Sequence, residues 1–366
     1  MKLVLPIKLA PSAEQTELLL KTTHQFNAAC NEIAETAFQL HTANKIKLQK
    51  HVYYSIREKY GLPAQLTIRA ISKVAEAYKR DKSVKPTFKP ESAMIYDPRI
   101  MSFKGLESVS LVTVGGRVLV PMVLGTYQKA RIGAIRGQAD LIYRNGVFYL
   151  YLTLDVPESD PICPEGFLGV DLGIVNIAVD SDGTVHSGKS VNRTREKHDV
   201  LRAALQSAGT KSAKRHLKHL SGRTARFCRD VNHCISKHLV AKAKDTGRGI
   251  ALENLKGIRD RKPASKAQRR RLNSWGFYQL RQFIEYKSRL VGVPVVLVDP
   301  AYTSQTCPNC GFIHASNRPD RNSFICGSCG FAGSADHVAA VNIAARAVVN
   351  PPIVACSPNI AASPRL

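Results

Sequence analysis

The sequence predicts a multidomain α+β protein, with a small β-barrel that carries a helical insertion and an α/β domain that carries an inserted metal-binding ribbon. Three observations predict this class. Strand and helix patterns alternate along the chain, a Pro-rich segment at 157–165 divides it, and two Cys-x-x-Cys pairs stand near the C-terminal end. The length of 366 residues is enough for two or three domains.

The first part of the chain reads as one strand followed by helices. Residues 2–9 have a short strand pattern, and Ser12 with Gln15 forms a capping box that opens a helix. Cys30 falls on the apolar face of this helix, where a free thiol is usually a small core residue. We expect residues 11–85 to form a helical domain.

From residue 86 the pattern changes to strands. Gly115-Gly116 and Asn145-Gly146 are tight-turn pairs between apolar runs, and they predict two hairpins. Several short strands around a helical insertion indicate a small barrel. We expect it to contain residues 1–10 and 86–160.

Beyond the Pro-rich segment, two apolar stretches each carry a single acid. Residues 167–179 read as one strand that contains Asp171, and residues 249–255 as a strand that ends in Glu253. An unpaired acid among apolar neighbours is costly to bury, so a metal or a basic partner is expected. A third acid, Asp336, stands at the start of a helical pattern.

Basic residues outnumber acidic ones by 53 to 28, which gives a net charge of +25 spread along most of the chain. This balance predicts binding to a polyanion. A helical region at 190–245 is rich in Arg, Lys and His, with Cys234 on its apolar stripe, and a basic loop follows at 256–272. A solvated helix face is the alternative for the basic helices, and a linker is the alternative for the loop.

Candidates for nucleic-acid contact are basic and aromatic side chains of these regions and of the N-terminal helices. Tyrosine and lysine can stack on bases or contact phosphates, but core packing is an equal alternative for the tyrosines. The candidates are Tyr53, Tyr54, Lys73, Lys79, Arg193, Arg195, Lys214, Arg215, Lys218, Arg223, Arg269, Arg270 and Arg271.

Two cysteine pairs, Cys307/Cys310 and Cys326/Cys329, are separated by fifteen residues. A glycine follows each pair and allows a tight turn around a metal. Four thiolates on two such turns can close a tetrahedral zinc site, which holds the fold and has no open position for chemistry. We therefore expect one structural Zn²⁺ in a ribbon at 303–333.

Asp171, Glu253 and Asp336 share a context that indicates one site. The order strand, hairpin, helices, strand and helix is that of an RNase H-like fold, in which such acids meet at one edge of the sheet. Three clustered carboxylates repel one another and need divalent cations, and Mg²⁺ (or Mn²⁺) prefers carboxylate and phosphate oxygens. Two such ions can activate a water and stabilise the leaving oxygen of a phosphodiester.

The C-terminal half resembles TnpB, a family of transposon-encoded RNA-guided DNA nucleases related to type V CRISPR effectors. In place of the Asn that usually stands two residues after the last acid of the family, this chain has Val338. The stretches that carry the resemblance are 169–174, 250–255, 275–280, 286–287, 303–305, the cysteine pairs and 336–343.

The resemblance implies a RuvC-like nuclease domain at 161–302 and 334–349, with Asp171, Glu253 and Asp336 as its metal-binding triad. It also implies that the barrel is a wedge domain and that residues 11–85 form a recognition domain. Its implied partners are a guide RNA from the transposon end and double-stranded target DNA with a short flanking motif. We expect a monomer within a ribonucleoprotein, in the cytoplasm and near the nucleoid of a prokaryote.

Two other functions stay open. An RNA-guided repressor that no longer cleaves DNA is expected to lack one or more triad acids, and this chain has all three. A transposase would join strands with the same acids and would bind transposon ends without RNA. We further expect residues 51–80 to read the flanking motif and residues 350–366 to form a disordered tail.

Overall fold

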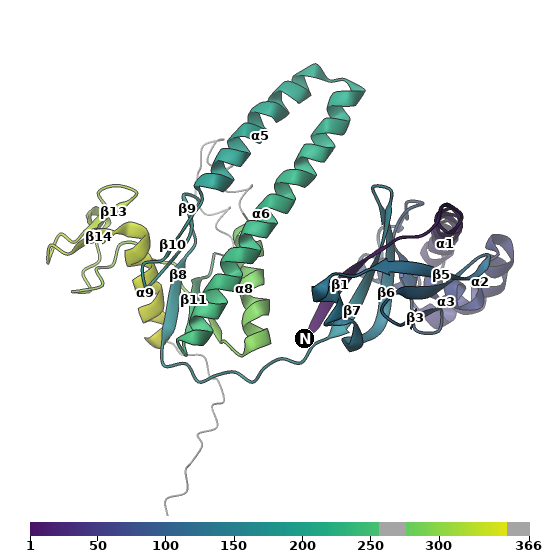
Figure 1. Ribbon diagram of the computed structural model, residues 1–366, viewed down its shortest axis with the longest axis horizontal. Coiled ribbons are helices and arrows are strands. Elements are labelled where there is room, and N and C mark those ends of the chain that lie inside the picture. The colour runs from purple at the N-terminus through teal and green to yellow at the C-terminus, as the bar shows by residue number, and fades with distance from the viewer. Residues whose placement is uncertain (256–275, 350–366) are drawn as a thin grey trace, which may run out of the picture. The chain divides into compact units, whose positions relative to one another are not determined.

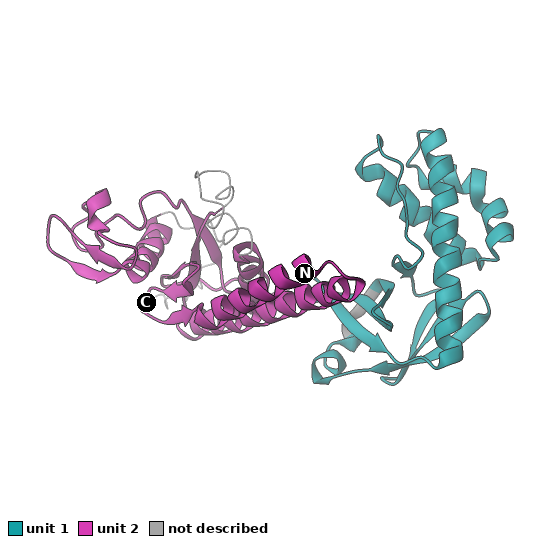
Figure 2. Ribbon diagram, turned by 90° about the horizontal axis from the view of Figure 1, so that it is seen from above, with its two compact units in different colours: residues 1–157 teal, residues 158–366 magenta. Residues whose placement is uncertain are grey.

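The computed structural model describes residues 1–255 and 276–349, without the side chains of 134–136. The chain divides into two compact units, residues 1–157 and 158–366 (Figure 2). The division falls at the start of the Pro-rich segment. Arg269, Arg270, Arg271 and the expected tail lie outside the described residues.

Unit 1 begins with a strand and three helices. The capping box confirms the predicted helix start, because the Gln15 amide donates to Ser12 Oγ (3.2 Å) and the Ser12 amide donates to Gln15 Oε1 (3.1 Å). Cys30 is buried, as predicted. The helices are α1 (Ala13–Gln39), α2 (Lys45–Tyr60) and α3 (Ala64–Arg80).

The seven strands of unit 1 form a nearly closed sheet in the order β2-β6-β7-β1-β5-β4-β3. The two strands at the ends of this order, β2 and β3, are consecutive in the sequence and are connected by residues 97–100. One core contains both sheet residues such as Ile7 and Leu150 and helix residues such as Phe26 and Ile33. The strands are β1 (Lys2–Leu9), β2 (Met94–Tyr96), β3 (Met101–Lys104), β4 (Ser108–Thr113), β5 (Gly116–Val123), β6 (Ile135–Arg144) and β7 (Val147–Asp155).

Both predicted hairpins are present, and one is shifted. Asn145 and Gly146 have positive φ (53° and 80°) between β6 and β7, as a tight two-residue turn requires. In the other hairpin Thr113 pairs with Gly116, so the turn lies one residue earlier than predicted. The reason is the Thr113 hydroxyl, which donates to the Gly116 carbonyl at 2.7 Å and accepts from the Gly115 amide at 3.2 Å.

Unit 2 contains a five-stranded sheet in the order β10-β9-β8-β11-β12, in which β8, β11 and β12 are parallel. The single strand predicted at 167–179 is wrong, because the chain turns at 172–175 and returns antiparallel. Gly173 permits this turn, since a Cβ there would lie 2.6 Å from the Asn176 carbonyl oxygen. The strands are β8 (Phe167–Asp171), β9 (Asn176–Asp180), β10 (Val185–Ser187), β11 (Gly249–Glu253) and β12 (Val295–Val298).

Helices cover both faces of this sheet (Figure 1). Helix α9 (Ala335–Val349) packs on Phe167 and Ala251, whereas α6 (Lys211–Asp245) and α8 (Phe277–Val291) pack on Leu168 and Ile250. The side chains of each strand therefore alternate between the two helical layers.

Helix α5 (Lys189–Ala208) runs antiparallel to α6, and the pair extends beyond the sheet (Figure 1). We call this pair the basic arm. Cys234 on α6 is exposed, so its predicted place in the core is wrong; its neighbour Ile235 occupies the buried face instead.

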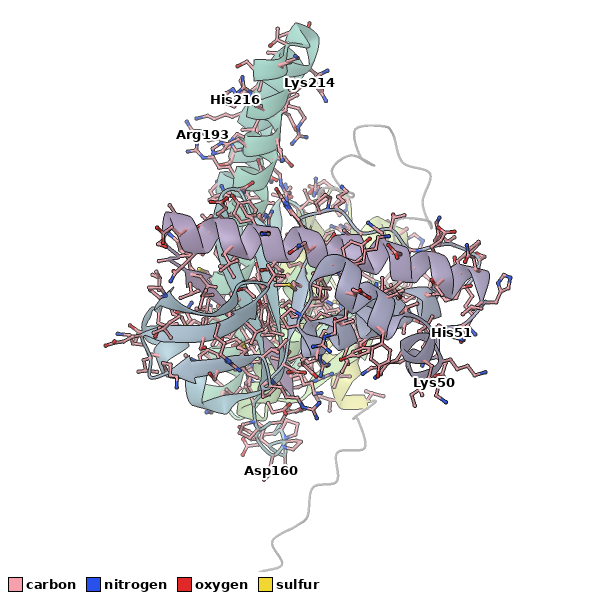
Figure 3. The ribbon with its side chains drawn as sticks, turned by 90° about the vertical axis from the view of Figure 1, so that its right-hand side faces the viewer. Lys50, His51, Asp160, Arg193, Lys214 and His216 are labelled. Carbon is pink, nitrogen blue, oxygen red and sulfur yellow. The ribbon has the colours of Figure 1, made fainter. Side chains whose placement is uncertain are left out.

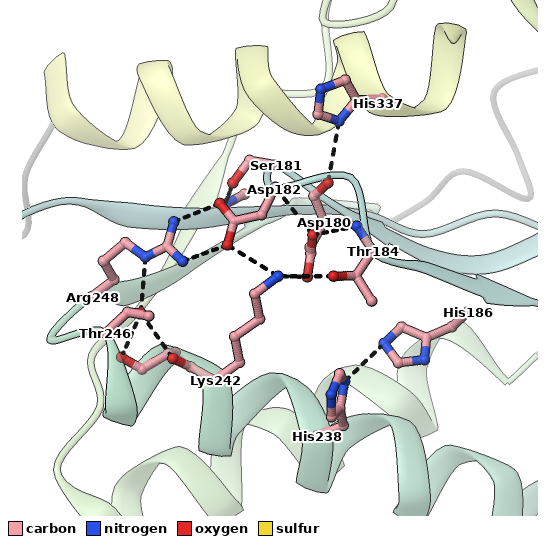
Figure 4. Close-up of polar contacts among 12 residues, drawn as sticks. Asp180, Ser181, Asp182, Thr184, His186, His238, Lys242, Thr246, Arg248 and His337 are labelled. Atoms are coloured by element: carbon pink, nitrogen blue, oxygen red, sulfur yellow. Dashed lines mark hydrogen bonds and ion pairs between the residues drawn. The ribbon is translucent and has the colours of Figure 1, made fainter.

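A network of charged side chains fastens the root of the arm to the β9–β10 turn (Figure 4). Lys242 Nζ donates to the buried Asp180 Oδ2 (2.6 Å) and to Thr184 Oγ1 (2.9 Å). Arg248 forms two hydrogen bonds with Asp182, at 2.8 and 2.6 Å, and holds the pKa of that carboxyl well below its usual range.

Across the described residues we find no helix with the length and apolar character needed to cross a membrane.

Candidate functional site

The three predicted acids converge at one edge of the unit 2 sheet. Asp171 ends β8 and Glu253 ends β11, and the parallel register that pairs Val170 with Leu252 carries both acids to the same edge. Asp336 lies in the first turn of α9, the helix packed on β8. The structure thus brings together three acids of which the first, Asp171, and the last, Asp336, are 165 positions apart in the sequence.

Gly169 allows α9 to approach the sheet this closely. A Cβ at this position would lie 2.0 Å from the Ala340 carbonyl oxygen and 2.6 Å from the Ala344 amide nitrogen. Any side chain would therefore push α9, and with it Asp336, away from β8.

The electrostatics of Asp171 reflect the charges of the other two acids. Burial, followed by the negative charges of Glu253 and Asp336, raises the pKa of Asp171 to about 7. Burial also raises the pKa of Glu253. A positive charge placed among these carboxylates would relieve both effects.

Arg318 is a functional candidate that the sequence did not reveal. It lies between the two cysteine pairs, is half-buried, and its charge opposes the rise in the pKa of Asp171. Nothing in the local sequence marks it among the 53 basic residues, since only the folded ribbon carries it toward the acids.

The acids fit a hard divalent cation by the chemistry of their donor set. All three offer carboxylate oxygens, the ligands that Mg²⁺ prefers. Asn176 donates a hydrogen bond to Asp336, and Thr303 donates one to Glu253. Their oxygens are more widely spaced than the sulfurs of the ribbon. In the described part of the chain only the cysteine group has all its ligand atoms within 4.8 Å of one another.

The four ribbon cysteines form a compact metal-ligand set. Sulfur–sulfur distances are 3.6 Å for Cys307–Cys329 and 3.6 Å for Cys310–Cys326. The glycines that follow the pairs, Gly311 and Gly330, have φ of 75° and 69°, which confirms the predicted tight turns.

The ribbon has a small core of its own beneath the cysteines. Val338, at the position that departs from the family pattern, is buried there with Phe324 and two of the cysteines. Its place in this core explains why an apolar side chain is accommodated. The ribbon strands are β13 (Ser323–Ile325) and β14 (Ala332–Ser334).

The nucleic-acid candidates of unit 1 divide by exposure. Tyr54 is 79 % exposed and Lys79 is exposed, whereas Tyr53 packs against the core. Lys73 is turned inward: its Nζ donates to Asn27 Oδ1 (2.8 Å) and to the Ala93 carbonyl (2.6 Å), and burial lowers its pKa. The structure therefore favours packing roles for Tyr53 and Lys73.

The candidates of unit 2 that the structure describes lie along the basic arm. Figure 3 shows Arg193, Lys214 and His216 pointing outward from it. Arg195 is half-buried and its Nη2 contacts Cys228 Sγ at 3.6 Å, so it also joins the two helices. The exposed candidates of the arm are Arg193, Lys214, Arg215, Lys218 and Arg223.

Two family models match the chain. The model described as "Probable transposase" matches residues 153–258, which include Asp171 and Glu253. The model described as "Cas12f1-like, TNB domain" matches residues 277–343, which include the ribbon and Asp336.

Curated relatives match over most of the chain. A TnpB-like protein of Methanocaldococcus jannaschii is 28% identical over 266 residues, which are 67% of this chain and 92% of the relative. The CRISPR-associated endodeoxyribonuclease Cas12f1 of Sulfoacidibacillus thermotolerans is 30% identical over 264 residues, which are 67% of this chain. The chain spans 60% of that protein and 59% of the Cas12f1 of Syntrophomonas palmitatica.

A solved structure shares the fold. The mini-RNA-guided endonuclease CRISPR-Cas phi3 matches with a TM-score of 0.59 and 11% identity, over 96% of this chain and 93% of that one.

Proposed function

We propose that this chain is an RNA-guided DNA endonuclease of the TnpB family. In this proposal it binds a guide RNA from the transposon end, recognises a short motif beside the target and hydrolyses DNA phosphodiesters. The observation that carries the proposal is the convergence of Asp171, Glu253 and Asp336 at one sheet edge. The net charge of +25 supports nucleic acids as the partners.

The domain layout forms part of the proposal. The sheet of unit 2, with parallel β8, β11 and β12 and an antiparallel hairpin, supports an RNase H-like, RuvC-like nuclease domain interrupted by a zinc ribbon. The nearly closed sheet of unit 1 supports the wedge role, and the helices packed on it support a small recognition domain.

We assign Asp171, Glu253 and Asp336 as ligands of Mg²⁺ or Mn²⁺. When bound, two such ions would supply an activated water and stabilise the leaving oxygen of the phosphodiester. Arg318 would bind the scissile phosphate, because its positive charge already acts on Asp171 from the ribbon side. Cys307, Cys310, Cys326 and Cys329 would hold one structural Zn²⁺ that keeps this ribbon folded.

Partner contacts are assigned by exposure. The outward-pointing basic side chains of the arm would contact phosphates. Tyr54 and Lys79 remain candidates for nucleic-acid contact within the proposed motif-reading region 51–80. Cutting of a library with randomised flanking bases, by wild type and by Tyr54→Ala, would separate base reading from phosphate contact. Only base reading changes the preferred motif.

The central test is Asp171→Ala in the complex of protein and guide RNA. DNA cleavage should fall by on the order of a thousandfold or more, because loss of a metal ligand removes several kcal/mol of transition-state stabilisation. Binding of RNA and target should persist. The control is Asp245→Ala, an exposed acid at the end of α6, which should cleave normally. Full cleavage by Asp171→Ala would contradict the assignment of the three acids as metal ligands.

A transposase is the second candidate, because one matching family model carries that description. A discrete RNA that copurifies with the protein would support the guided nuclease. Its absence, together with specific binding of transposon ends, would support the transposase. An RNA-guided repressor is disfavoured because the triad is complete.

A further inference from the structure

Two of the triad acids accept hydrogen bonds from uncharged side chains. The first of these donors is Asn176, the half-buried residue that opens β9 directly after the Gly173 turn. Its Nδ2 donates to Asp336 Oδ2 at 2.9 Å. The amide fixes the rotation of this carboxylate without adding a charge to the site. Within the described residues, Asp336 Oδ1 has no hydrogen-bond donor.

The second donor is Thr303, which is buried at the base of the ribbon. Its Oγ1 lies 2.5 Å from Glu253 Oε1 and 3.1 Å from the Pro300 carbonyl oxygen. A hydroxyl has one proton, and the shorter contact takes it. The part of the chain that the structure describes supplies no donor for Glu253 Oε2.

Asn342 ties the second donor to α9. It is buried, and its Nδ2 donates to the backbone carbonyls of Thr303 (2.8 Å) and Thr306 (2.7 Å). Both amide protons of Asn342 are therefore used to hold the start of the ribbon. The helix that carries Asp336 thus also fixes the residue that orients Glu253.

We propose that Asn176 and Thr303 are positioning residues for the metal centre, an inference that rests on the function proposed above. Each binds one oxygen of a carboxylate and leaves the other oxygen for a divalent cation. Neither residue is a metal ligand. Side chains that orient metal ligands in this way are typically worth 10- to 100-fold in metal affinity.

The test measures Mn²⁺ affinity of the full-length chain, with its ribbon zinc and without nucleic acid, by the paramagnetic resonance of free Mn²⁺. Thr303→Val removes the hydroxyl and keeps the shape, and it should weaken Mn²⁺ binding about tenfold or more. Thr303→Ser keeps the hydroxyl and should restore binding. Thr306→Val is the matched control, because the Thr306 hydroxyl donates only to the Tyr302 carbonyl.

Asn176→Ala provides a second test at a site that is only half-buried, and it should also weaken Mn²⁺ binding. Thermal melting without Mn²⁺ identifies any variant that has lost its fold. Asp171→Ala tests the metal centre separately from the positioning role. If it loses Mn²⁺ while Thr303→Val and Asn176→Ala both retain wild-type affinity, the positioning role is overturned and the metal centre stands. Unchanged binding by Asp171→Ala would overturn the metal centre and this inference with it.

Discussion

At the scale of single residues, chemistry separates the two proposed metal sites of the chain. Carboxylate oxygens at Asp171, Glu253 and Asp336 suit Mg²⁺, and thiolates on the ribbon suit Zn²⁺, so neither cation is expected to displace the other. The residue type alone did not reveal the role of Lys73. Its charge suggested phosphate contact, but the folded chain surrounds its amine with two oxygen acceptors.

The four ribbon cysteines are predicted to bind one structural zinc ion. Elemental analysis of the pure protein should find about one zinc per chain, because four thiolates complete one tetrahedral site. Cys310→Ser should lose the metal and lower the melting temperature. Cys234→Ser is the control, since this exposed thiol lies outside the ribbon and should leave the zinc content unchanged.

Thiol labelling gives an independent measurement of the same prediction. A chelator should expose the four ribbon thiols to an alkylating reagent at neutral pH. Burial raises the pKa of Cys30 to about 12, so this thiol should stay unlabelled while the protein is folded. Zinc content well below half per chain in folded protein would argue against the ribbon assignment.

At the scale of elements, contact between α9 and β8 determines where the third acid lies. The contact depends on Gly169, and its partners on α9 are backbone atoms of Ala340 and Ala344 that cannot rotate away. The geometry of the triad is therefore sensitive to a residue that carries no functional group.

Gly169→Ala should destabilise unit 2 by about 1–3 kcal/mol, because the new methyl group forces the helix to shift. DNA cleavage should fall more than guide RNA binding, since Asp336 moves with α9. Chemical denaturation and single-turnover cleavage would measure the two effects. Gly166→Ala is the control, because no atom lies within 4 Å of its added Cβ. Wild-type stability in Gly169→Ala would contradict the packing argument.

At the scale of the whole molecule, positive charge is widely distributed, and the basic arm displays part of it on a projecting pair of helices (Figure 1). The arm is anchored at its root by Lys242 and Arg248, which pair with Asp180 and Asp182. An anchored arm with outward-pointing cations is suited to hold a nucleic-acid backbone in a fixed place.

Replacing Lys214, Arg215 and Lys218 by glutamine should weaken nucleic-acid binding at every sequence. The slope of log affinity against log salt should become shallower by about two to three, if all three side chains contact phosphates. Titrations at several salt concentrations provide the measurement. The double variant Lys214→Arg with Lys218→Arg keeps the charge and should bind normally. An unchanged slope in the glutamine variant would show that the arm faces solvent.

The sequence by itself determined those features whose cause lies within a few residues. The Asn145-Gly146 turn, the Ser12 capping box and the cysteine turns depend on local backbone preferences, and all three are present. The alternation of strands and helices placed Asp171 inside an expected strand, Glu253 at the end of one and Asp336 at the start of a helix, which was enough to nominate them.

Tertiary structure alone decided what depends on distant partners. The break after Asp171 follows from pairing between β8 and β9, and the exposure of Cys234 follows from which face of α6 meets the sheet. Arg318, Asn176 and Thr303 become candidates only when the ribbon and α9 are folded against the sheet. Their local sequence resembles that of many loop residues, because burial and proximity to a carboxylate are properties of the packed chain.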